Sequence, residues 1–229
     1  MAPKSALAQA LRAVSKALQS SGRSAMIIGG IAVIARGVPR LTKDIDATVA
    51  GGETDLHGLL EGLKKHGIVP RVPNAVEFAR ESQVLLLVHD PSGVDVDLSL
   101  AWLPFELEAL EAAEDVSVHG TEVRIPRVDD LVIYKVVGWR PQDRQDIERL
   151  VSLHGKAMNL ERVMRLTREL SEALEAPERL TEVEQLITRV LKSGSQNPGK
   201  AISAEDAGHG PERPQETMPA QSRTRHRKK

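Results

Sequence analysis

Two aspartates one residue apart, Asp44 and Asp46, follow a Gly29-Gly30 pair in the stretch IIGGIAVIARGVPRLTKDIDATV. This stretch constrains the fold more than any other part of the chain. The diglycine lies between an apolar run and a helical segment, and it predicts a strand-to-helix turn because glycine accepts positive φ. The Asp-Ile-Asp run alternates polar and apolar residues, which predicts a strand whose two carboxylates point the same way.

The two carboxylates have the chemistry of a divalent-cation site. Residues i and i+2 of a strand lie about 7 Å apart at Cα, so Asp44 and Asp46 can converge on Mg²⁺ (or Mn²⁺), which favours few carboxylates plus waters and substrate phosphates. A second alternating segment, 94–100, offers Asp97 as a third carboxylate, with Asp95 competing on the same face. Such alternation is also typical of any half-exposed strand, but two acidic strands after a glycine turn favour a metal site.

A nucleotide is the expected partner of such a cation. A turn without Cβ atoms lets a phosphate approach the backbone, and a triphosphate needs cationic or hydrogen-bonding partners. The loop before the aspartates carries such groups, although solvated loop charge is the alternative interpretation. We therefore expect nucleotide contacts from Gly29, Gly30, Arg40, Thr42 and Lys43.

A second dense cluster occurs in IYKVVGWRPQDRQDIERL. Lys135 lies among apolar residues of a predicted helix, so its ammonium group is a candidate to point into a cleft. Arg140 follows, and Asp143 and Asp146 share one helical face at i, i+3 spacing. The same spacing is typical of a surface helix with charge pairs, so both interpretations of this segment stay open.

Composition excludes several other kinds of site. The chain has no cysteine, which removes disulfides, thiolate metal sites and cysteine nucleophiles. The histidines lack zinc-site spacing, and neither a G-K-[ST] phosphate loop nor a G-x-S-x-G serine motif occurs. We see no signal peptide and no run of about 18 apolar residues, so we expect a cytoplasmic protein without membrane contact.

The pattern of apolar residues predicts an α/β (α+β) fold with a small mixed sheet. Residues 1–127 are expected to form the α/β core with an N-terminal helix, and 128–192 a helical unit that completes the cleft. Residues 193–229 are polar and end in SRTRHRKK, so we expect a disordered tail. The expected strands are 25–28, 44–49, 75–80, 83–89, 94–100, 116–118 and 121–125.

These motifs resemble a known superfamily. Hydrophobic-Gly-Gly, thirteen residues and then Asp-Ile-Asp is similar to the signature of the DNA polymerase β-like nucleotidyltransferases. Within that superfamily, RLTKDID, VDLSLAWLPFE and KVVGWRPQDRQDIERL resemble the bacterial branch of AbiEii-type nucleotidyltransferases from type IV toxin–antitoxin systems. The resemblance spans residues 23–153.

The resemblance implies a metal-dependent transfer of a nucleotidyl group from an NTP to a hydroxyl. It implies that Asp44 and Asp46 hold Mg²⁺ and that Asp97, favoured over Asp95 by register, completes the metal site and helps deprotonate the acceptor. Lys135 would then meet phosphate charge. The remaining residues of that motif, which would orient the cations, bind nucleotide or touch the acceptor, are Arg140, Asp143 and Asp146.

Three functions remain open at this level. The first is an active nucleotidyltransferase, with tRNA or another RNA, a protein or a small molecule as acceptor, and with a cognate antitoxin as partner if it is a toxin. The second is a non-catalytic module of the same fold that binds RNA or a partner, to which a basic tail would add electrostatic affinity. The third is an antibiotic nucleotidyltransferase.

Overall fold

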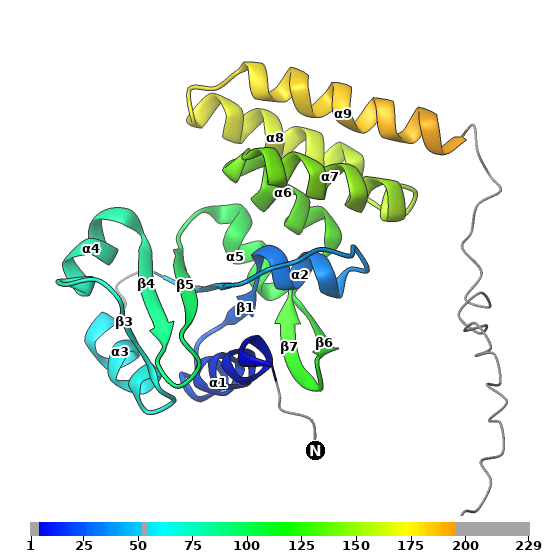
Figure 1. Ribbon diagram of the computed structural model, residues 1–229. Helices are drawn as coiled ribbons and strands as arrows, with labels where there is room; N and C mark the ends of the chain where they lie inside the picture. The colour runs from blue at the N-terminus through cyan, green and yellow to red at the C-terminus, as the bar shows by residue number, and fades with distance from the viewer. Residues whose placement is uncertain (1–4, 52–54, 196–229) are drawn as a thin grey trace, which may run out of the picture. The chain divides into compact units, whose positions relative to one another are not determined.

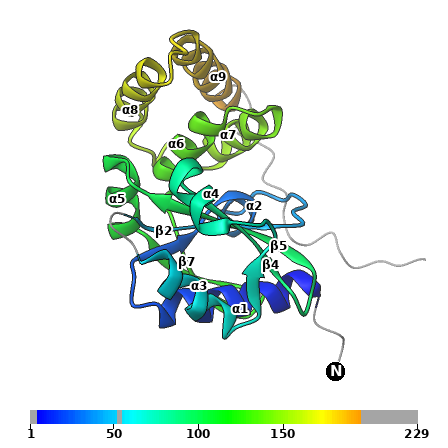
Figure 2. The ribbon, with the colours of Figure 1, turned by 90° about the vertical axis from the view of Figure 1, so that its left-hand side faces the viewer.

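Within residues 5–51 and 55–195, which the computed structural model describes, five strands form one mixed sheet in the order β1-β2-β5-β4-β3. Figures 1 and 2 together label these strands. Strands β2 and β5 are parallel, and the other neighbouring pairs are antiparallel. The strand bounds are β1 (Ala25–Ile27), β2 (Ile45–Ala50), β3 (Ile68–Pro70), β4 (Val84–His89) and β5 (Val94–Ala101).

One face of the sheet is apolar and buried. Ile45 and Ala47 of β2 and Val96 and Leu98 of β5 lie on this face, and each is at most 2% exposed. Helices α1 (Ala6–Ser20) and α3 (Leu56–Lys64) lie along this side of the sheet (Figure 2). Because strand side chains alternate between faces, the residues between these apolar positions, which include the acidic ones, point to the opposite face.

The opposite side of the sheet carries the other helices (Figures 1 and 2). Helix α6 packs against α2 and α5, which join it to the sheet, and against α7 and α8, while α9 packs against α7 and α8. The acidic face of the sheet is therefore directed toward these helices. The bounds are α2 (Gly29–Ala35), α5 (Pro104–Glu111), α6 (Val128–Gly138), α7 (Pro141–His154), α8 (Leu160–Ala173) and α9 (Glu178–Ser195).

The predicted α/β fold class is confirmed, and most predicted elements lie within a few residues of the observed ones. The hairpin of β6 (Glu114–Val118) and β7 (Thr121–Ile125) turns at His119 and Gly120, as expected. The strand predicted at 75–80 is wrong, because this segment forms helix α4 (Ala75–Ser82). Its buried residues, Ala75, Val76 and Ala79, follow helical spacing, and they override the Val-Glu-Phe alternation that favoured a strand.

Two further predictions concern the C-terminal tail and membrane-spanning helices. The tail predicted from residue 193 lies outside the described residues, apart from the last turn of α9 at 193–195. Among the helices that the structure describes, none has the length and apolar character needed to cross a membrane.

Candidate functional site

Three carboxylates lie in a row on the acidic face of the sheet. Asp46 of β2 and Asp97 of β5 are register partners in the parallel pair, and Asp44 lies two residues before Asp46. Burial raises the pKa of Asp46, and the negative charges of Asp44 and Asp97 raise it further. Asp44 and Asp97 are therefore close enough to Asp46 for their charges to oppose its ionisation, and a cation beside Asp46 would relieve this repulsion.

The diglycine makes room for this row. Gly29 has φ of +60°, and a Cβ atom built on it would lie 1.9 Å from Oδ2 of Asp46. A Cβ on Gly30 would lie 2.5 Å from Oγ1 of Thr42. The amide of Ile28 also donates a hydrogen bond to the carbonyl of Asp46 at 2.9 Å. The turn therefore holds the Asp46 side chain against the backbone that begins α2.

The polar residues of the loop before β2 make different contacts. The Thr42 hydroxyl donates to Oδ1 of Asp44 at 2.8 Å, so it orients the first carboxylate. Lys43 is exposed to solvent beside it. Arg40 instead reaches α7, where its Nη1 lies 2.6 Å from Oδ2 of Asp146.

Lys135 is buried between two carboxylates. Its Nζ lies 3.0 Å from Oδ1 of Asp143 and 3.0 Å from Oδ2 of Asp146, and all three side chains are at most 6% exposed. Arg140 donates to Asp143 from Nε at 2.9 Å and from its backbone amide at 3.0 Å. Pro141 begins α7, so Asp143 occupies the third helical position, from which a side chain can reach back to the residue before the helix.

The buried aspartates of α7 are positioned to orient cations. Asp143 holds Lys135 and Arg140, and Asp146 holds Lys135 and Arg40. Each carboxylate already has two cationic partners and is at most 2% exposed. Of the alternatives considered from the sequence, this geometry favours orientation of the cations over direct contact with an acceptor.

The carboxylate row and the cationic cluster act on each other electrostatically. The positive charges of Lys135 and Arg140 lower the pKa of Asp46 and so counter part of the rise caused by burial and its acidic neighbours. Hydrogen bonding and charge from Asp143 raise the pKa of Arg140, and the charges of Asp46 and Asp44 raise it further. Segments far apart in sequence therefore form one site, with anionic and cationic sides.

Arg71 belongs to this site, although nothing in the sequence indicated it. Its Nη1 lies 2.7 Å from Oδ1 of Asp97 and donates to the carbonyl of Leu87 at 2.9 Å. The contact depends on the pairing of β3, which is only three residues long, with β4. Asp95, the competitor of Asp97, is exposed and lies two residues before it, outside the register pairing of β5 with β2.

The donor set suits a hard divalent cation. Among the described residues, no group of three or more acidic, histidine or cysteine side chains is placed to hold a metal ion, and Asp97 is engaged by Arg71. The row nevertheless offers only carboxylate oxygens, and burial together with like charge raises the pKa of Asp46. Mg²⁺ and Mn²⁺ are the ions that such ligands prefer, and Mg²⁺ is commonly held by only one or two carboxylates.

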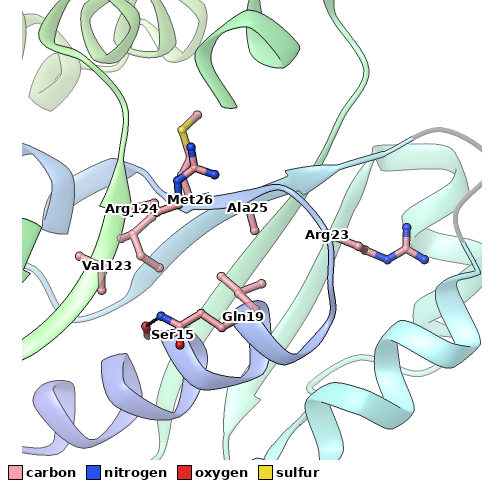
Figure 3. A pocket seen from close by; sticks show the side chains of 9 residues that line it. Ser15, Gln19, Arg23, Ala25, Met26, Val123 and Arg124 are labelled. Atoms are coloured by element: carbon pink, nitrogen blue, oxygen red, sulfur yellow. Dashed lines mark hydrogen bonds between the residues drawn. The ribbon is translucent and has the colours of Figure 1, made fainter. Parts of the chain in front are cut away.

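A separate cavity of about 150 Å³ lies between α1, β1 and β7 (Figure 3). Ser15 and Gln19 of α1 line one side of it and Ala25 and Val123 the other, while the side chains of Met26 and Arg124 point away from α1 (Figure 3). Arg124 is held by the carbonyls of Leu110 and Ala113. The three carboxylates do not line this cavity, so it is distinct from the site on the acidic face.

The sequence of the chain matches a family model over residues 5–190, and the family is described as a nucleotidyltransferase of unknown function (DUF6036). The chain belongs to this nucleotidyltransferase family. The family description agrees with the resemblance to nucleotidyltransferases noted above, while the AbiEii-type branch stays a prediction. No curated protein sequence matches the chain significantly.

The chain also resembles solved structures at low sequence identity. The solution structure of the antibiotic-resistance factor ANT(2'')-Ia has a TM-score of 0.52 at 19% identity and covers 77% of this chain and 97% of its own. A crystal structure of ANT(2'')-Ia with adenylyl-2''-tobramycin gives 0.44 at 17% identity, covering 82% and 98%. An antigenic nucleotidyltransferase-like protein from Paracoccidioides brasiliensis gives 0.38 at 15% identity, covering 76% and 92%.

Proposed function

We propose that this nucleotidyltransferase-family protein transfers a nucleotidyl group from an NTP to a hydroxyl in a reaction that depends on Mg²⁺ or Mn²⁺. The observation that carries the proposal is the register pairing of Asp46 with Asp97, within reach of the positive charges of Lys135 and Arg140. A triphosphate and its metal need an anionic side for the cation and a cationic side for the phosphates. This site has both.

Each residue has a role that follows from its place. Asp44, Asp46 and Asp97 would hold the cation, which when bound would stabilise charge on the attacking and leaving oxygens. Asp97 would also accept the proton of the acceptor hydroxyl, since it is partly exposed. Arg140, whose side chain is 73% exposed although Asp143 holds it, and the exposed Lys43 would donate to phosphate oxygens.

The buried part of the cluster would act through its charge and its rigidity. Lys135 lies too deep to move freely, but its positive charge acts at Asp46. Asp143 and Asp146 would keep Lys135, Arg140 and Arg40 in fixed positions, so that no reorganisation is needed as phosphate charge develops. Gly29 and Gly30 would keep the approach to Asp46 and Thr42 free of side chains.

A non-catalytic binding module is the weaker alternative. Buried ion pairs add little net stability compared with apolar packing, because removing the charges from water is costly. The Lys135–Asp143–Asp146 cluster and the self-repelling carboxylate row are therefore hard to explain as scaffold. Both fit a charged ligand, and neighbouring carboxylates repel RNA phosphates unless a cation is bound, which favours metal-dependent transfer over RNA binding alone.

The acceptor would be identified by a transfer screen with α-³²P- and γ-³²P-labelled NTPs. RNA including tRNA, protein and small-molecule acceptors would be tested, the last including antibiotics because a structure of similar fold is an antibiotic-resistance factor. RNA labelling would favour the toxin-type reaction, and drug labelling the antibiotic-type reaction.

The proposal predicts transfer of the α label but not the γ label, dependence on Mg²⁺ or Mn²⁺, and loss of transfer in Asp46→Asn. Transfer of the γ label would indicate a phosphoryl transferase instead. Metal-independent binding of RNA without any transfer would favour the non-catalytic module.

A further inference from the structure

A line of register partners crosses the sheet from its β3 edge to the carboxylate row. The amide of Arg71 donates to the carbonyl of Leu86 at 3.0 Å, so the two residues lie opposite each other just beyond β3. Leu86 pairs in register with Asp97, and Asp97 pairs in register with Asp46. Register partners share a face of the sheet, so Arg71 lies on the same face as the acidic row.

The guanidinium of Arg71 is anchored on this face. One nitrogen, Nη1, contacts both Oδ1 of Asp97 at 2.7 Å and the backbone carbonyl of Leu87 at 2.9 Å. The bond to a main-chain carbonyl fixes the nitrogen to the sheet itself. The Arg71 side chain is 28% exposed and that of Asp97 is 38% exposed, so the pair remains within reach of solvent and of a ligand.

The pairing has a consequence for cation binding. Asp44 has the neutral Thr42 hydroxyl as its hydrogen-bond partner, whereas Asp97 has a full positive charge at Oδ1. A divalent cation at this oxygen would be repelled by the adjacent guanidinium, so the cation and Arg71 compete for the Asp97 carboxylate. Arg71 therefore neutralises the negative charge of Asp97 that the cation would otherwise neutralise.

We propose that Arg71 is a positioning residue that holds Asp97 in the cation-free protein and competes with the divalent cation for it. This inference rests on the proposed metal site. It implies that the row binds a cation weakly by itself, because loading requires the Arg71–Asp97 pair to open. Phosphate oxygens of an incoming nucleotide would give the released guanidinium a new partner, so cation and nucleotide would bind cooperatively.

The test measures Mn²⁺ binding to the nucleotide-free protein by electron paramagnetic resonance of free Mn²⁺, which needs no acceptor and no turnover. Arg71→Gln is expected to bind Mn²⁺ about two- to fivefold more tightly, the range that a partly exposed ion pair allows. Arg71→Met, which keeps the apolar stem, carries the same expectation. Arg80→Gln removes an equal charge from the exposed face of α4 and serves as the matched control, with no expected change.

The variants separate failure of this inference from failure of the metal site. If Asp46→Asn abolishes Mn²⁺ binding but Arg71→Gln and Arg71→Met bind like Arg80→Gln, the competition is overturned and the metal site stands. If Asp46→Asn binds Mn²⁺ like the wild type, the acidic row is not the cation site and both proposals are overturned.

Discussion

A Cβ atom on Gly29 would lie 1.9 Å from the Asp46 carboxylate, so the glycine and the central acid of the site are fitted to each other. Gly29→Ala would also force a side chain into φ of +60°, which costs about 1–2 kcal/mol. We expect Gly29→Ala to lose nucleotidyl transfer together with stability, because Asp46 must move. Urea unfolding and transfer rates would be measured on the same preparation.

Gly22→Ala is the matched control for that substitution. Gly22 has a similar φ of +67°, but a Cβ there would meet no atom within 4 Å. The Gly22→Ala variant should lose a similar amount of free energy of unfolding from backbone strain while keeping its transfer rate. Equal transfer rates for Gly22→Ala and Gly29→Ala would show that the fit to Asp46 is unimportant.

Asp46→Asn should make the cation-free protein more stable while removing its activity. Burial and the charges of Asp44 and Asp97 raise the pKa of Asp46, so ionisation of this group opposes folding above its ordinary pKa of 3.8. A neutral amide removes the repulsion, and a gain of about 0.5–2 kcal/mol is typical when a strained functional site is relieved. Thermal unfolding at pH 7 in a chelator would measure it, and a clear loss of stability would contradict the electrostatic account.

Lys135→Met should destabilise the fold strongly. It leaves Asp143 and Asp146 buried with one cationic partner each, Arg140 and Arg40, so we expect a loss of about 3 kcal/mol, the lower end of the range for a broken buried pair. Arg165→Met breaks an exposed pair with Glu169 at 2.9 Å and should change stability by less than about 1 kcal/mol. Chemical denaturation of both variants tests the difference, and similar losses would contradict the buried cluster.

Acid should weaken the fold through Asp143. Burial alone would raise the pKa of this carboxyl, but hydrogen bonds from Arg140 and Lys135 outweigh burial and leave the pKa below its ordinary value of 3.8. A lowered folded-state pKa means that the stabilisation is complete above the unfolded value and is lost as pH falls through the folded one. Urea unfolding between pH 5 and pH 2 should therefore show a shallower decline in Asp143→Asn than in the wild type. An equally steep decline would argue against this role.

The sequence reveals the parts of the site that depend on local spacing. The alternation around Asp44, Asp46 and Asp97 follows from strand geometry alone, and Lys135 is conspicuous as a charge within an apolar helical run. Such patterns are readable because they repeat within a few residues of the chain.

The other contacts of the site depend on pairing between segments that are far apart in the sequence. The contact of Arg71 with Asp97 requires β3, β4 and β5 to be aligned. The pair between Arg40 and Asp146 likewise joins the loop before β2 to α7. Helix α4 was predicted as a strand because its alternation is ambiguous until its buried residues are known. No local pattern carries this information.

The most direct test of the central claim is the rate of α-³²P transfer, with the acceptor found in the screen, for the wild type and for Asp46→Asn, Asp97→Asn and Asp95→Asn. The row on β2 and β5 predicts losses of about 100-fold or more for the first two variants. Asp95→Asn, which removes an exposed carboxylate from the same strand, should keep near wild-type activity. Transfer that survives in Asp46→Asn, or that falls equally in Asp95→Asn, would contradict the account.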